Sequence, residues 1–270
     1  MPDERESIGI IAGGGKFPFM AANSAREQGF KVIAVAHDGE TDPSLADSVD
    51  AITWIKLGQL GKLISSFKKY RIKKALMAGT ITKRHMFGKA SPDLKGLVLM
   101  SRLAFFHDDG ILRGVAEELA KEGIEIVSAV QYLPELLAPS GCLTRKKPGK
   151  KEEADIQFGW KVAKELGRLD IGQCVVVRDM TVLALEAIDG TNETIIRGAK
   201  LAKKNAVVVK VSKPEQDLRF DLPSVGVETI QIMSGVRASV LAVEAGKTLI
   251  FDKSEMIEYA DNVGISIVSY

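Results

Sequence analysis

The chain has 270 residues, 46% of them hydrophobic, and its 37 basic and 35 acidic side chains leave a net charge of +2. This length fits two domains better than one, and the balanced charge gives no indication of nucleic-acid binding. Cys142 and Cys174 lack metal-ligand spacing, which predicts free thiols in a reducing compartment. The polar start MPDERES does not fit a signal peptide, and no run approaches the roughly 20 apolar residues of a membrane span. We therefore expect a cytoplasmic protein.

The first residues predict a βαβ unit, with a strand over 7–12, a helix over 17–28 and a second strand over 30–36. Glycines let the backbone approach a ligand closely, and the amides of the following helix face an anion, so a nucleotide phosphate fits here. The spacing matches neither the G-x-G-x-x-G fingerprint nor a P-loop, which disfavours NAD and ATP. A tight strand-to-helix turn explains the glycines equally well. The turn consists of Gly13, Gly14, Gly15 and Lys16.

A second set of ligand-binding groups follows a strand expected over 74–78, after an amphipathic helix over 57–70. This strand runs into Gly79, Thr80 and Lys83, at the end where parallel sheets present ligand groups. A small backbone, a hydroxyl and an ammonium suit a phosphate or a ribose. An ordinary polar loop with one solvated lysine is the alternative.

Two aspartates stand before a helix that is expected to run to about residue 122. Asp108 and Asp109 can cap the helix amides and complement the helix dipole. Together with His107 they could instead ligate a metal, but neighbours in sequence point in different directions, which disfavours a shared site. The preceding apolar helix is expected over 94–106.

Residues 144–153, TRKKPGKKEE, are charged and almost free of apolar groups, which is typical of a linker or an exposed arm. We place the domain boundary here. The basic cluster in this segment could contact anionic lipid headgroups or a substrate phosphate, although a solvated connector explains the cluster better. The cluster consists of Arg145, Lys146, Lys147, Lys150 and Lys151.

The second half again alternates helices and strands, and its strand over 206–211 runs into KVSKPEQDLRFDLPSVG, a segment dense in charges and prolines. Asp217 and Asp221 could hold a divalent cation through oxygen ligands, while Arg219 and Lys213 meet phosphate oxygens. A surface ion-pair cluster is the plainer alternative. Because function concentrates on loops positioned by rigid strands, we predict that this loop binds a polyanion.

Four motifs carry a family resemblance: GIIAGGGKFP, LMAGTITK, DDGILRGVA and QDLRFDLPSVG, in this order. With them the chain resembles the LpxI family, the UDP-2,3-diacylglucosamine pyrophosphatases of lipid A biosynthesis, over nearly its whole length. The resemblance implies hydrolysis of UDP-2,3-diacylglucosamine to UMP and 2,3-diacylglucosamine 1-phosphate, with Mg²⁺ or Mn²⁺ as the cofactor. Glu186, as a third acidic ligand, and Thr191 match the family pattern. His107 and Asn192 depart from it, which puts a ligand role for His107 and a charged role at position 192 in doubt.

We predict an α/β protein of two domains: a Rossmann-like UDP-binding domain over 1–138, a linker over 139–153, and a smaller lipid- and substrate-binding domain over 154–270. The smaller domain is expected to carry the acidic loop. A non-catalytic nucleotide-sugar or lipid-binding protein is the alternative function, and an oxidoreductase is disfavoured by the missing fingerprint. Transient contact with the cytoplasmic face of the inner membrane and a homodimer are kept open.

The predicted site draws on both domains. Catalysis is assigned to Asp221, Asp217 and Arg219, and metal binding to Asp217, Asp221 and Glu186. Substrate binding is assigned to Gly13, Gly14, Gly15, Lys16, Gly79, Thr80, Lys83, Asp108, Asp109, Thr191, Lys213 and Gln216.

Overall fold

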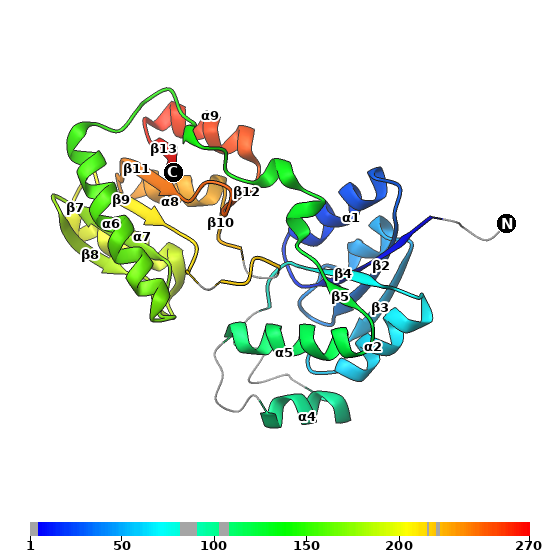
Figure 1. The fold of residues 1–270 in the computed structure, drawn as a ribbon. Coiled ribbons are helices and arrows are strands. Elements are labelled where there is room, and N and C mark those ends of the chain that lie inside the picture. Colours follow the sequence, from blue (N-terminus) through cyan, green and yellow to red (C-terminus); the bar gives the residue numbers. More distant parts are fainter. Residues whose placement is uncertain (1–4, 82–90, 103–107, 215, 220–221) are drawn as a thin grey trace. The chain divides into compact units, whose positions relative to one another are not determined.

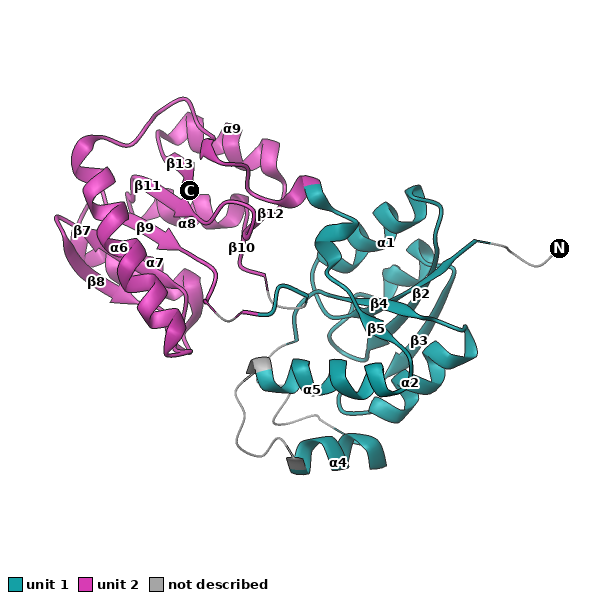
Figure 2. Cartoon of the chain, viewed as in Figure 1, with its two compact units in different colours: residues 1–134, 217–221 teal, residues 135–216, 222–270 magenta. Residues whose placement is uncertain are grey.

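The chain forms two compact units in the computed structural model (Figures 1 and 2). Unit 1 comprises Met1–Pro134 and Asp217–Asp221, and unit 2 comprises Glu135–Gln216 and Leu222–Tyr270. Each unit has its own sheets and core, in keeping with the predicted α/β class. The structure describes residues 5–81, 91–102, 108–214, 216–219 and 222–270.

Unit 1 is built on a parallel sheet of five strands in the order β3-β2-β1-β4-β5 (Figure 1). In register, Ile10 lies between Ala34 and Leu76, and all three side chains are fully buried. Such continuous apolar runs are typical of parallel strands that are covered on both faces. The strands are β1 (Ser7–Ala12), β2 (Lys31–His37), β3 (Ala51–Ile55), β4 (Lys74–Ala78) and β5 (Glu125–Ile126).

Helices α1, α2 and α5 pack against this sheet, whereas α4 packs on α2 and α5. In α2, Leu60, Leu63, Ile64 and Phe67 repeat at the spacing of one helix face, and all four are buried. The Phe67 ring reaches β1 so closely that a Cβ at Gly9 would lie 2.8 Å from it. The helices are α1 (Phe17–Glu27), η1 (Pro43–Ser48), α2 (Leu60–Lys69), α4 (Leu94–Arg102), α5 (Asp108–Lys121) and η2 (Ala129–Gln131), and η3 (Pro134–Leu136) follows at the unit boundary.

Unit 2 is built on a mixed sheet of six strands in the order β6-β13-β11-β9-β7-β8. Strands β13, β11 and β9 are parallel, whereas β6, β7 and β8 run antiparallel to their neighbours. The strands are β6 (Gly141–Cys142), β7 (Cys174–Arg178), β8 (Thr181–Leu185), β9 (Val207–Lys210), β11 (Val240–Val243) and β13 (Ser266–Ser269). A second, two-stranded sheet pairs β10 (Ser224–Val225) with β12 (Leu249–Ile250).

Helices cover both faces of the large sheet in unit 2. A Cβ at Gly159 would lie 2.8 Å from Val209, and a Cβ at Gly198 would lie 2.5 Å from Val176, so these glycines let α6 and α7 approach the strands closely. Val209 and Val176 belong to separate core clusters. The helices are α6 (Lys150–Arg168), α7 (Gly190–Ala202), α8 (Val227–Gly235) and α9 (Lys253–Val263).

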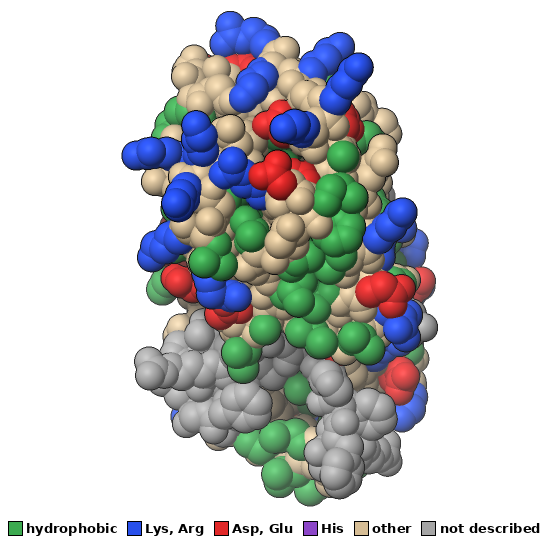
Figure 3. All heavy atoms as spheres, turned by 90° about the vertical axis from the view of Figure 1, so that its left-hand side faces the viewer, with side chains coloured by type: hydrophobic (Ala, Val, Ile, Leu, Met, Phe, Trp, Pro, Cys, Tyr) green, Lys and Arg blue, Asp and Glu red, His purple; other side chains and the backbone are tan. Residues whose placement is uncertain are grey.

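Large hydrophobic side chains are exposed on both units, and Figure 3 shows them gathered over β8 and α7 and again around α4. Among the helices that the structure describes, none is long and apolar enough to cross a membrane. The exposed residues in these two places are Leu94, Leu97, Val98 and Met100 on unit 1, and Leu185, Ile188 and Leu201 on unit 2.

The expected linker over 139–153 is not an unstructured connector, because β6 and the first turn of α6 lie inside it. The carboxylate of Glu152 accepts a hydrogen bond from Gly149 N at 2.8 Å, which caps the start of α6. Glu152 and Glu153 also place negative charge in the first turn, where the helix dipole favours it. The charges at the end of this segment therefore belong to a capped helix, while residues 143–149 form neither helix nor strand.

The segment that follows Gln216 also differs from the expectation. It was expected to belong with residues 154–270, but Asp217–Asp221 groups with unit 1. There, Ser128 Oγ donates a hydrogen bond to the carbonyl oxygen of Leu218 at 2.9 Å. The chain thus leaves unit 2, contributes a short segment to unit 1 and then returns to unit 2.

Candidate functional site

The glycine turn after β1 lies against the loop after β4. Gly13 N donates to Ala78 O at 2.8 Å, Gly14 N donates to Thr80 O at 2.7 Å, and Thr80 N donates back to Gly14 O at 3.1 Å. A Cβ at Gly13 would lie only 2.6 Å from Thr80 O, so the approach of the two backbones requires glycine. The two predicted ligand-binding loops are therefore in direct contact.

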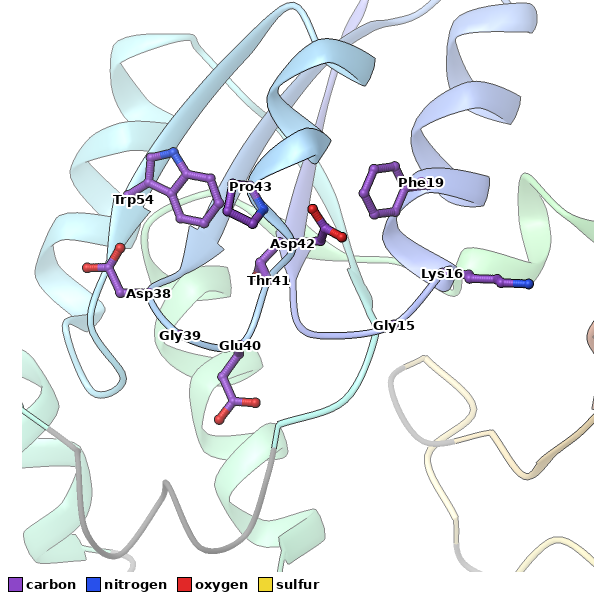
Figure 4. Close-up of a pocket in the computed structure, with 10 residues that line it drawn as sticks. All are labelled: Gly15, Lys16, Phe19, Asp38, Gly39, Glu40, Thr41, Asp42, Pro43 and Trp54. Atoms are coloured by element: carbon purple, nitrogen blue, oxygen red, sulfur yellow. The ribbon is translucent and has the colours of Figure 1, made fainter. Parts of the chain in front are cut away.

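A cavity of about 900 Å³ opens beside the glycine turn, at the carboxyl ends of β1 and β2 (Figure 4). Figure 4 shows the rings of Trp54 and Phe19 on opposite sides of it, with Asp42 and Pro43 between them. Its size lies within the range of small-molecule pockets. The lining residues are Gly15, Lys16, Phe19, Asp38, Gly39, Glu40, Thr41, Asp42, Pro43 and Trp54.

Sequence reasoning identified Gly15 and Lys16 but missed the lining residues after β2. A signal for them was present, because an acidic residue after the second strand of a βαβ unit is a common ribose ligand. Asp38 directly follows β2 and meets this description. The structure thus adds the acidic residues of the loop after β2 to the predicted glycine turn as lining of the cavity.

The loop after β2 is held in place by buried hydrogen bonds among His37, Thr41 and Ala12. His37 Nδ1 donates to the carbonyl oxygen of Ala12 at 2.9 Å, and Thr41 Oγ1 donates to the same oxygen at 2.7 Å. His37 N donates to Thr41 Oγ1 at 3.1 Å, which closes the group. Burial lowers the pKa of His37 below its ordinary value, so its ring is neutral at physiological pH. The loop after β2 is therefore tied to the end of β1 without adding a charge.

In the predicted catalytic loop, Asp217 and Arg219 form a bidentate ion pair. Arg219 Nε and Nη2 donate to the Asp217 carboxylate at 2.9 and 2.6 Å, and Arg219 N donates to it at 3.1 Å. The side-chain hydrogen bond from Arg219 lowers the pKa of Asp217, so this carboxylate is ionised. The Arg219 side chain is 48% exposed and that of Asp217 is 17% exposed. Asp217 therefore orients a guanidinium that remains accessible to an anion.

Two further predicted substrate ligands, Lys213 and Gln216, make contacts within unit 2. Lys213 Nζ pairs with Asp170 at 2.6 Å. Gln216 is buried, and its Oε1 accepts hydrogen bonds from Ser212 Oγ at 2.9 Å and from Lys213 N at 3.0 Å. These bonds position the chain just before Asp217.

Sequence reasoning missed Glu244, which anchors the same stretch and belongs to no recognisable motif. Its Oε2 accepts a hydrogen bond from Ser212 N at 2.9 Å and pairs with Lys164 Nζ at 2.6 Å. Burial acts to raise the pKa of Glu244, but hydrogen bonds from Lys164, Lys247 and Ser212 N bring it below its ordinary value. An ionised carboxylate therefore holds the end of β9 in place.

Glu186 and Thr191 are brought together within unit 2. Thr191 Oγ1 donates to Glu186 Oε1 at 2.7 Å, and Gln173 N donates to Glu186 Oε2 at 3.0 Å, so both oxygens of this buried carboxylate have a donor. Asn192, where the family pattern differs, donates through Nδ2 to Glu228 Oε1 at 3.3 Å.

Several predicted site residues fall outside the part of the chain that the structure describes. They are Lys83 and Asp221, together with the side chains of Asp108 and Asp109 at the start of α5, and His107, whose ligand role was in doubt, also lies outside. Within the described ranges, no group of three or more His, Cys, Asp or Glu side chains is arranged to hold a metal ion. The described side chains alone therefore do not make up a metal site, and Asp217 has Arg219 as its partner.

The chain matches two family models that together cover nearly all of it. Residues 7–136 match the LpxI N-terminal domain, and residues 139–268 match the LpxI C-terminal domain. Among curated proteins, it is 34% identical over 272 residues to the UDP-2,3-diacylglucosamine pyrophosphatase LpxI of Caulobacter vibrioides. That alignment covers 97% of this chain and 96% of the relative.

Solved structures resemble the chain only weakly. A biotin carboxylase complex from Campylobacter jejuni is 14% identical, with a TM-score of 0.30, over 74% of this chain and 42% of that one. A UDP-N-acetylmuramate:L-alanyl-gamma-D-glutamyl-meso-diaminopimelate ligase from Neisseria meningitides is 13% identical, with a TM-score of 0.30, over 98% of this chain and 78% of that one. Likenesses at this level support no statement about function.

Proposed function

Because the chain belongs to the LpxI family, we propose that it hydrolyses the pyrophosphate bond of UDP-2,3-diacylglucosamine, releasing UMP and 2,3-diacylglucosamine 1-phosphate. The observation that carries this proposal is the 34% identity, over 97% of the chain, to a relative named for this activity. Matches to both domains of the family support the proposal, since each half of the chain matches one of them. The reaction is proposed to belong to lipid A biosynthesis and to take place in the cytoplasm.

The uridine nucleotide is proposed to bind the cavity of unit 1. The strand order β3-β2-β1-β4-β5 supports this, because Rossmann-like sheets bind nucleotides at the carboxyl ends of strands near the point where the order reverses. The rings of Trp54 and Phe19 suit a pyrimidine, and the carboxylates of Asp38 and Asp42 suit ribose hydroxyls. The glycine turn offers backbone amides to a phosphate.

UMP alone should therefore change the fluorescence of Trp54, because its ring lines the cavity. The chain has two tryptophans, and the other, Trp160, packs against Tyr270 in unit 2. Titration of UMP into the Trp160→Phe variant should retain the fluorescence change, and the Trp54→Phe variant should lose it. A change that follows Trp160 instead would assign the nucleotide to unit 2.

Charge neutralisation at the pyrophosphate is assigned to Arg219 and to a divalent cation, Mg²⁺ or Mn²⁺. The cation is proposed to use Asp217 and Asp221, because Glu186 belongs to unit 2 and has a hydrogen-bond donor on each of its carboxylate oxygens. Mg²⁺ needs only one or two protein carboxylates when substrate phosphates and water complete its coordination. When bound, such a cation would offset the negative charge of the phosphate oxygens.

Purified protein incubated with the diacylated UDP-sugar and Mg²⁺ should release UMP, which chromatography with absorbance detection can quantify. EDTA should stop the release, and Mg²⁺ or Mn²⁺ in excess should restore it. Binding of the substrate without any UMP release would favour the non-catalytic alternative. Release that continues at full rate in EDTA would contradict the metal proposal while leaving the hydrolase proposal intact.

A further inference from the structure

Helix α4 is firmly attached to unit 1 by its inner side. Leu99 is buried in the core of the unit, and a Cβ at Gly96 would lie 2.0 Å from Gly58 O, which shows how closely the helix backbone approaches its neighbour. Asp93 fixes the start of the helix, because its Oδ1 accepts a hydrogen bond from Gly96 N at 2.9 Å and its Oδ2 accepts one from Lys62 N at 3.2 Å. The opposite side of α4 therefore faces outward in a defined orientation.

This outer side is apolar, which is unusual for a helix on the surface of a protein. Leu94, Leu97 and Val98 follow the i, i+3, i+4 spacing of one helix face, and Met100 extends that face. The four side chains are between 44% and 78% exposed. Figure 3 shows hydrophobic side chains at this place, at the bottom of the view. An exposed apolar face of this kind indicates a binding partner.

The two helices at this face, α2 and α4, carry only basic charged residues, while Asp93 before α4 and the glutamates of the neighbouring α5 lie close by. Helix α2 packs beside α4 and carries Lys62, Lys68 and Lys69, and α4 itself carries Lys95. Neither helix contains an acidic residue. Lys68 and Lys95 share Glu122 as an ion-pair partner, so this group keeps an excess of positive charge.

We propose that the outer face of α4 docks unit 1 onto a lipid bilayer with anionic headgroups. Leu94, Leu97, Val98 and Met100 would enter the boundary of the acyl chains, and the lysines of α2 and α4 would meet the headgroups. The proposal deepens the proposed function, whose diacylated substrate resides in a membrane. It does not depend on turnover, because attachment to vesicles can be measured without substrate.

A bilayer fits this surface better than a second copy of the chain does. In a symmetric dimer the same patch would face itself, which would bring the lysines of the two copies together. Like charges at the edge of an interface oppose association, whereas anionic headgroups complement them. The lysines of α2 and α4 are therefore the feature that favours the bilayer.

The test is co-sedimentation of the full-length protein with vesicles of phosphatidylglycerol and phosphatidylethanolamine. The Leu94→Gln/Leu97→Gln variant should lose roughly tenfold or more of its partitioning, because two exposed apolar anchors are removed. The matched control is Ile188→Gln/Leu201→Gln, which alters two exposed apolar residues of unit 2 and should bind as the unaltered chain does. Binding should weaken in vesicles of phosphatidylcholine alone and at high salt.

Equal binding of the two double variants, or no binding of the unaltered chain, would overturn the proposal. Two further measurements identify other occupants. Loss of UMP release from a short-chain, water-soluble substrate in Leu94→Gln/Leu97→Gln, with vesicle binding unchanged, would show that the face holds the acyl chains of the substrate. A dimer in sedimentation velocity that this variant dissociates would show a second copy there. Circular dichroism confirms that each variant is folded.

Discussion

Replacing Arg219 by alanine should lower kcat for the proposed hydrolysis by roughly 100- to 1,000-fold, as removal of a donor that stabilises transition-state charge does in other enzymes. The guanidinium is oriented by a bidentate pair with Asp217 and is 48% exposed. Because the guanidinium is largely exposed, the variant should still fold, and any cost of leaving the less exposed Asp217 without this side-chain partner will appear in its unfolding. Steady-state kinetics of UMP release, together with a thermal unfolding curve, measures both quantities.

Arg168→Ala is the matched control, because Arg168 also forms an exposed pair with a carboxylate, Glu165, at 2.8 Å. It should leave kcat unchanged. The kcat of Arg219→Lys should lie between those of Arg219→Ala and Arg168→Ala, since lysine keeps the charge but lacks the planar guanidinium that matches phosphate oxygens. Near-normal turnover in Arg219→Ala would remove this residue from the active site, whatever the role of Asp221.

Replacing Gly79 by alanine should destabilise unit 1 by roughly 2–4 kcal/mol. Gly79 has φ +94°, and a Cβ there would lie 2.5 Å from Gly14 O and 2.8 Å from the carbonyl carbon of Gly13. Backbone atoms cannot yield to this contact as a flexible side chain would. The substitution should therefore separate the loop after β4 from the glycine turn, and the variant should lose UMP affinity as well as stability.

Gly123→Ala separates the cost of backbone conformation from the cost of the close contact, because Gly123 has φ +79° but no atom within 4 Å of an added Cβ. This variant introduces only the backbone strain, and its free energy of unfolding should fall by about 1–2 kcal/mol. Denaturant unfolding measures both variants. An equal loss of stability in the two would mean that the close approach at Gly79 contributes nothing beyond its backbone conformation.

The strands of unit 1 could be predicted well from the sequence, and two of them, Ser7–Ala12 and Lys74–Ala78, have the bounds that we expected. Runs of buried apolar residues bounded by glycines and polar residues specify such strands locally. The position of the glycine turn and of the loop after β4 at the carboxyl ends of their strands was also predicted, whereas their direct contact was not. The start of α6 could not be predicted, because charges that cap a helix have the same composition as a linker.

The candidate site was less accessible to sequence reasoning, because its polar residues acquire their roles from tertiary contacts. Gln216 and Lys213 carry groups that suit a phosphate, yet hydrogen bonds and an ion pair engage them within unit 2. Glu244 and Lys164 lie 80 positions apart and share an ion pair that local pattern does not reveal. Asp38 and Trp54 come together only because β2 and β3 are neighbours in the sheet.

The segment that begins at Asp217 has a consequence for the order of events on the ribosome. Residues up to Pro134 are synthesised first, but the last piece of unit 1 is not made until residue 217 of 270. At about 5–20 residues per second, the intervening stretch of roughly 80 residues takes about 4–16 s. During that interval neither Leu218, whose carbonyl oxygen accepts the hydrogen bond from Ser128, nor Arg219 has been synthesised. A fragment that ends at residue 138 reproduces this nascent state, so full-length protein is required to measure the complete site.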